Sequence, residues 1–92
     1  MENIETGEEP MLINYLATFY THFGAMRFKQ FCGNKGMSAK MAPVPRELSS
    51  SCGVCVRFEA SCAPETAEHE DMECCYLIAP DGTFVKTGER QA

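Results

Sequence analysis

The stretch LINYLATFYTHFGAMRFKQFCG, residues 12–33, predicts a strand, a tight turn and a helix in direct succession. Its first part, Leu12–Phe19, is rich in large apolar and aromatic residues, which is typical of a largely buried strand. Thr21 can then cap a helix, because its hydroxyl can accept a hydrogen bond from a free backbone N–H. The helix has one apolar face, formed by Ala25, Phe28 and Cys32 with Phe31 beside them. Gly33 or Gly36 is expected to end it.

Two further strands and a loop are expected next. Ser38–Val44 is predicted to be a strand that ends or lies at a sheet edge near Pro43 and Pro45, because prolines cannot donate ladder hydrogen bonds. β character resumes at Val54–Phe58. The sequence PVPRELSSSCGVC, residues 43–55, is therefore predicted to connect two strands.

The C-terminal part is expected to contain a short helix and a hairpin. Residues 63–73 are compatible with a helix, although they are acidic and short of large apolar residues. Cys75–Ala79 and Thr83–Lys86, on either side of the turn PDG, predict a hairpin. The element order β-α-β-β-α-β indicates an α/β (α+β) fold, a small two-layer sandwich of the ferredoxin-like type, and it allows an extra strand in the C-terminal hairpin.

The length of 92 residues is typical of one domain. We expect a mobile acidic lead at residues 1–10, a single domain at 11–88 and a short tail at 89–92. The longest apolar-rich run, residues 11–20, is too short to span a bilayer and follows an acidic segment, where a signal peptide would be basic. A cytoplasmic protein without membrane contact is therefore expected.

Charge is distributed unevenly along the chain. The net charge is −5, yet residues 11–57 contain six basic residues against the single acid Glu47. Arg46 and Arg57 flank the loop, where they could favour the thiolate form of a cysteine or hold an anionic group. The simpler interpretation is a solvated surface. The acidic total and the lack of an aromatic-basic motif argue against nucleic-acid binding.

Six cysteines could form a disulfide scaffold. The missing secretion signal and the sufficient apolar content favour reduced thiols instead. Cys32 and Cys74 are expected to face the core. Cys52 could likewise be a small buried apolar residue, since free cysteine is often buried.

The loop and its surroundings resemble a known family. The matching features are Pro43, Pro45 and Arg46, the serine run at 49–51, Cys52 with Gly53, and a following strand that contains Arg57. The earlier FYTHFGAM resembles the family's first strand-to-helix turn through Phe19, Thr21, His22 and Ala25. The family is domain of unknown function 3343, described as putative selenium/sulfur carrier protein-like. The resemblance covers residues 12–58.

The resemblance implies that Cys52 holds a persulfide or selenopersulfide. It would accept this group from a protein donor, such as a cysteine desulfurase-like enzyme, and pass it to an acceptor enzyme. Such a protein is a carrier without independent turnover, and it needs no cofactor besides the group on Cys52. The chemistry requires an accessible thiolate that a partner can reach. A loop between strands gives reach, and Gly53 leaves room for close approach.

Residues near Cys52 have the chemistry to stabilise an anion. Ser50 and Ser51 can donate hydrogen bonds, and Arg46 can supply positive charge. His22 could deprotonate Cys52 if its turn lies beside the loop. Each of these residues also has a simpler structural use, in a turn, at a helix terminus or in a surface ion pair.

Cys55 departs from the family pattern and creates the motif Cys52-Gly-Val-Cys55. In this sequence the motif enters a strand, so alternation sends the two thiols towards opposite faces and disfavours their pairing. A dithiol-disulfide oxidoreductase is therefore not expected.

Two alternatives remain open. Zinc or an iron-sulfur cluster could be bound by cysteines 52, 55, 74 and 75 together with Cys62 or His69, but adjacent cysteines rarely both ligate one ion, so no metal ligand is predicted. The other alternative is a non-catalytic protein- or metal-binding module with structural cysteines, which could form a homodimer through a strand edge.

Overall fold

The structure is a computed structural model that describes residues 11–91. Residues 1–10 and 92 lie outside the described part, and the predicted acidic lead lies there with them. The described elements are β1 (Ile13–Phe19), α2 (His22–Asn34), β2 (Ala39–Pro43), β3 (Val54–Ala60), the 3₁₀ helix η1 (Thr66–Glu68), β4 (Met72–Ile78) and β5 (Phe84–Glu89). Each strand predicted from the sequence is present, with ends that differ by a few residues.

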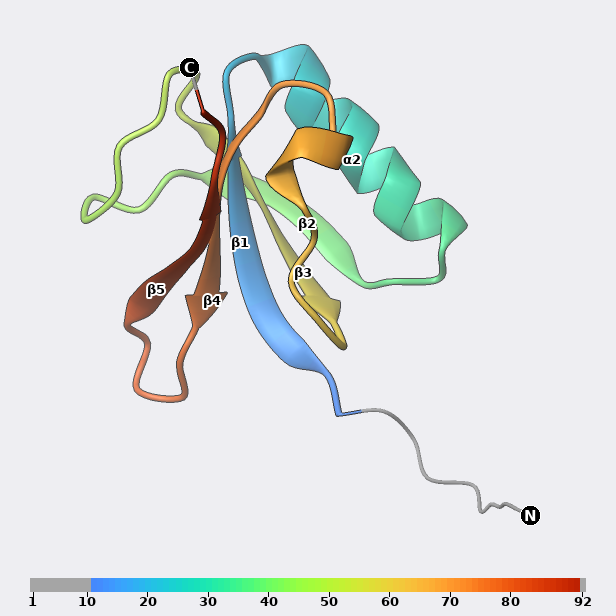
Figure 1. The fold of residues 1–92 in the computed structure, drawn as a ribbon, viewed down its shortest axis with the longest axis vertical. Helices are drawn as coiled ribbons and strands as arrows, with labels where there is room; N and C mark the ends of the chain where they lie inside the picture. Colours follow the sequence, from blue (N-terminus) through green and yellow to red (C-terminus); the bar gives the residue numbers. More distant parts are fainter. Residues whose placement is uncertain (1–10, 92) are drawn as a thin grey trace.

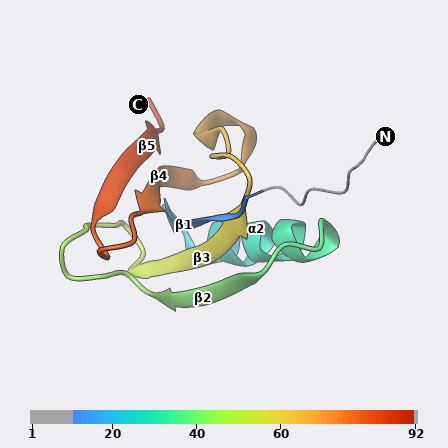
Figure 2. The same ribbon diagram turned by 90° about the horizontal axis from the view of Figure 1, so that it is seen from below.

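The strands form one antiparallel sheet in the order β2-β3-β1-β4-β5. Strand β3 lies between β1 and β2, the two strands that helix α2 connects, and β4 pairs with the other side of β1. This is the strand order of a ferredoxin-like sheet, and β5 extends it as the second strand of the predicted hairpin. Helix α2 lies against one face of the sheet (Figures 1 and 2). The predicted small α/β sandwich is confirmed.

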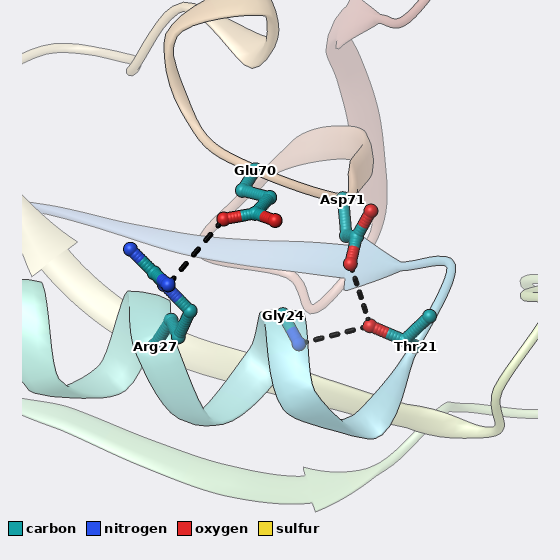
Figure 3. A network of polar contacts seen from close by, with 5 residues as sticks. All are labelled: Thr21, Gly24, Arg27, Glu70 and Asp71. Carbon is teal, nitrogen blue, oxygen red and sulfur yellow. Dashed lines mark hydrogen bonds and ion pairs between the residues drawn. The ribbon is translucent and has the colours of Figure 1, made fainter.

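Helix α2 begins where the sequence predicts, because Thr21 caps it. The Thr21 hydroxyl accepts a hydrogen bond from the Gly24 N–H at 3.0 Å and donates one to Asp71 Oδ2 at 2.8 Å. An ion pair between Arg27 and Glu70, 3.5 Å long, joins the helix to the same turn (Figure 3). The buried positions of the helix include the predicted Ala25, Phe28 and Cys32.

The two faces of the sheet carry two separate apolar clusters. The helix-side cluster contains Tyr15, Ala17, Phe19, Val56 and Phe58 from the sheet with Ala25, Phe28 and Cys32 from the helix. The opposite face, called the second face below, carries Leu16, Cys55, Cys74 and Tyr76. Val44 and Leu48, from the loop between β2 and β3, pack on the second-face cluster.

The prediction of a second helix at residues 63–73 is wrong. Only residues 66–68 form a single 3₁₀ turn, and strand β4 begins before the predicted helix would end. The segment lacks the large apolar residues that a helix needs to bury one face. Hydrogen bonds from the Arg90 guanidinium hold it instead, at 2.8, 2.8 and 2.6 Å from the carbonyl oxygens of Met72, Thr66 and His69 respectively.

Candidate functional site

The loop between β2 and β3 is fixed at its base and near its end. The Val44 N–H donates to the Gly53 carbonyl oxygen at 3.1 Å, which closes the base. Ser50 Oγ donates to the carbonyl oxygen of Phe19, the last residue of β1, at 3.2 Å. The loop therefore carries Cys52 to the end of the sheet at which β1 turns into α2 (Figure 1).

Cys52 is half-buried and packs against the helix-side cluster. Its Sγ donates a hydrogen bond to the Val54 carbonyl oxygen at 3.4 Å. Gly53 has a φ of +75°, a conformation that favours glycine and lets the chain turn into β3 directly after Cys52. Cys52 is thus held as a hydrogen-bonded thiol with part of its surface accessible.

The other five cysteines have different environments. Cys62 is exposed, and the remaining four are buried: Cys32, Cys55, Cys74 and Cys75. Burial raises the pKa of the Cys32 thiol to about 11. Burial also raises the pKa of Cys55 and Cys75. Because the thiolate is the nucleophile, these three buried thiols are poor acceptors of sulfur.

The predicted placement of Cys52 and Cys55 on opposite faces is confirmed. Cys52 contacts the helix-side cluster, and Cys55 belongs to the second-face cluster. The Cys55 thiol donates to the Pro43 carbonyl oxygen at 3.6 Å. This arrangement does not suit exchange between a dithiol and a disulfide, which needs adjacent sulfur atoms.

The serines before Cys52 donate their hydrogen bonds to groups of the protein. Ser50 bonds to the end of β1, as described above. The Ser51 N–H and Oγ donate to the Glu73 carboxylate, at 3.3 and 3.2 Å. In this conformation both serine hydroxyls have acceptors other than a group on Cys52, so their role as anion donors stays a prediction.

Two further predicted site residues, His22 and Arg46, have exposed side chains. His22 is the first residue of α2, and the hydrogen bond between Ser50 and Phe19 fixes the loop beside the turn before it. His22 is therefore at the same end of the sheet as Cys52. Arg46 lies in the first half of the loop.

Arg57 does not lie with Cys52. Strand alternation along β3 places it on the second face with Cys55, and its charge opposes the effect of burial on the pKa of Cys55. Its exposed side chain forms no ion pair with any other residue among 11–91. The structure thus separates Arg57 from the loop that it follows in sequence.

The alternative of a zinc or iron-sulfur site is not supported by the described part of the chain. Among residues 11–91, no group of three or more histidine, cysteine, aspartate or glutamate side chains could hold a metal ion. Cys74 and Cys75 point to opposite faces of the sheet, Cys74 into the second-face cluster and Cys75 into the helix-side cluster. Cys62 and His69 line a pocket of about 560 Å³ near the C-terminal end of α2.

Glu73 is the residue that sequence reasoning missed. It belongs to an acidic segment that is most simply interpreted as a solvated face. Its contact with Ser51 spans 22 positions and depends on how β4 pairs beside β1. No local motif indicates it, so only the tertiary structure reveals this carboxylate beside the residue that precedes Cys52.

The comparison with protein families shows to which family the chain is related. The family model described as "Putative Se/S carrier protein-like" matches residues 14–71. The chain belongs to this family. The match contains β1 except its first residue, α2, β2, β3 and the whole loop with Cys52. No curated protein and no solved structure gives a significant match. Within the described residues, no helix has both the length and the apolar character needed to cross a bilayer.

Proposed function

We propose that the protein carries sulfur or selenium as a persulfide or selenopersulfide on Cys52. The observation that carries this proposal is the position of Cys52: a partly accessible thiol, at the end of a fixed loop, within the region that the family model matches. The other three cysteines in that region are Cys32 and Cys55, which are buried, and Cys62, which is exposed. Cys62 is therefore the residue against which the proposal must be tested.

The proposed transfer leaves the oxidation level of the system unchanged. The Cys52 thiol loses its proton to the His22 imidazole, and the resulting thiolate attacks the terminal sulfur of a donor persulfide. The sulfur–sulfur bond of the donor breaks, the donor leaves as a thiolate, and a new sulfur–sulfur bond forms on Cys52. In the second half, a nucleophile of the acceptor attacks the terminal sulfur, and Cys52 leaves as the thiolate.

The proposed partners are proteins. A donor of the cysteine desulfurase-like class loads Cys52, and an acceptor enzyme unloads it. The end of the sheet that carries Cys52 suits this use, because the loop reaches the surface there and His22 is exposed beside the turn. The reaction needs a reduced thiol, which a cytoplasmic location supplies.

Uptake of labelled sulfur from a small-molecule persulfide tests the proposal. We expect Cys52→Ser to abolish uptake and Cys62→Ser to retain it, because the second variant removes the other accessible thiol without altering the loop. Retained uptake in Cys52→Ser, with loss in Cys62→Ser, would assign the chemistry to Cys62 and overturn the proposal.

A further inference from the structure

The second face carries a groove at the end of the sheet away from the Cys52 loop. The groove has a volume of about 760 Å³. This is within the range of small-molecule sites, which measure about 300–1,000 Å³. Val44 and Leu48 cover the opposite end of the same face, so the groove is the part that the loop leaves open. The sheet can be followed from its β2 side to its β5 side in Figure 2.

Two cations line the groove side by side. Lys40 of β2 and Arg57 of β3 are direct cross-strand partners, and both side chains are exposed. Like charges placed directly opposite each other on antiparallel strands destabilise the pair. Neither cation forms an ion pair with another residue among 11–91. An oxyanion bound between them would offset their repulsion.

The other groove residues restrict what such an anion can be. Asn14 of β1 lies opposite Glu59, the acidic residue that lines the groove two positions after Arg57. The Asn14 amide can donate a hydrogen bond to an oxyanion. Glu59 leaves the groove with one net positive charge, which disfavours a polyanion such as a nucleic acid. Leu12, Ile78 and Pro80 supply an apolar wall.

We propose that this groove binds a small organic anion, with one carboxylate or phosphate group between Lys40 and Arg57 and its apolar part against Leu12, Ile78 and Pro80. The inference does not depend on the chemistry of Cys52, which packs on the other side of the sheet. It explains why the basic part of the chain includes two cations that the carrier function does not use.

Backbone amide NMR shifts of the full chain, titrated with four probes, test the proposal. The probes are hexyl phosphate, hexanoate, inorganic phosphate and hexanol. We expect hexyl phosphate or hexanoate to shift the groove amides and to bind about tenfold more tightly than inorganic phosphate or hexanol, because only they combine charge with apolar burial. The tighter of the two identifies the head group. Hexanol binding as tightly as both charged probes would overturn the proposal, as would shifts confined to other surfaces.

Charge-removing variants provide the control. Lys40→Gln and Arg57→Gln should each weaken binding of the preferred probe by about tenfold, as the loss of a charge-assisted hydrogen bond does. Lys86→Gln, which removes a cation on β5 that pairs with Glu89 and does not line the groove, should leave binding unchanged. An equal effect of Lys86→Gln would indicate non-specific charge attraction. A loss of stability in ligand-free Arg57→Gln would show that Arg57 interacts with a residue of the protein itself. Either this loss or an equal effect of Lys86→Gln would contradict the assigned site.

Discussion

Glu73 accepts two hydrogen bonds from Ser51, the residue directly before Cys52. A carboxylate in this position disfavours a second negative charge nearby and competes for the donors that a persulfide would use. Glu73→Gln removes the charge and keeps an acceptor for Ser51. We expect Cys52 in this variant to react with iodoacetamide about threefold faster at neutral pH, measured as the rate of alkylation.

Glu70→Gln is the matched control for this prediction. Glu70 belongs to the same acidic segment but pairs with Arg27 on the helix. Its replacement should leave the alkylation rate of Cys52 unchanged. An unchanged or slower rate in Glu73→Gln would mean that the carboxylate supports the reactive form of the loop.

Thr18 offers a second test at the scale of one side chain. It is fully buried in β1, and its hydroxyl has no hydrogen-bond partner among the described residues. Thr18→Val keeps the shape of the side chain and removes the unsatisfied hydroxyl. We therefore expect the free energy of unfolding, measured in urea, to rise by about 1 kcal/mol. Thr87→Val is the control. The Thr87 hydroxyl donates a hydrogen bond to the Cys75 carbonyl oxygen at 3.2 Å, so its removal should lower the free energy of unfolding. A comparable loss in Thr18→Val would reveal a partner for its hydroxyl.

Predictability from the sequence differs between these residues. Thr21 as a cap and the opposite orientation of Cys52 and Cys55 follow from local rules, because capping and strand alternation involve only neighbours in sequence. The acceptors of Ser50 and Ser51 lie 31 and 22 positions away. Such partners depend on the register of the whole sheet, which one sequence does not specify.

The contact of helix α2 with the turn before β4 depends on Gly24. A Cβ on Gly24 would lie 2.6 Å from the Cβ of Asp71, which cannot move away without moving the backbone (Figure 3). We expect Gly24→Ala to lower the free energy of unfolding by about 1–3 kcal/mol, measured by chemical denaturation, because overpacking displaces the helix or the turn.

Gly33 in the same helix provides the opposite case. A Cβ there would meet nothing within 4 Å. Gly33→Ala should therefore stabilise the protein by up to about 1 kcal/mol through helix propensity alone. Equal effects of the two substitutions would contradict the close approach at Gly24.

The strands and helix α2 were predictable because their apolar patterns are strong and local. The segment 63–73 was not, because a polar sequence without a buried face can take several conformations. Its structure depends on Arg90, which donates to carbonyl oxygens 18 to 24 positions earlier. The separation of Arg57 from Cys52 has a different origin, because strand alternation along β3 puts Arg57 on the same face as Cys55, and the sequence alone could have indicated this.

At the scale of the whole molecule, buried thiols make stability depend on pH. Burial raises the pKa of Cys32 from its ordinary value of 9.0 to about 11, and it raises the pKa of Cys55, Cys75 and Tyr15 in the same direction. The unfolded chain therefore loses these protons at lower pH than the folded protein does. Stability is fully present below pH 9.0 and should fall as the pH rises towards about 11.

Unfolding midpoints in urea across this pH window check the prediction. Cys32→Ala should reduce the slope of stability against pH, whatever its cost at neutral pH, whereas Cys62→Ala, at an exposed position, should leave the slope unchanged. A stability that is constant from pH 9 to pH 11 would contradict the burial of these thiols.

Peptide mapping by mass spectrometry after loading with a persulfide donor tests the central claim most directly. We predict an added sulfur atom on Cys52 and none on the buried cysteines. Because Cys52 and Cys55 lie on one peptide, fragmentation of that peptide must locate the added atom. Added mass on Cys62 alone, or spread equally over several cysteines, would contradict the assignment of Cys52 as the carrier residue.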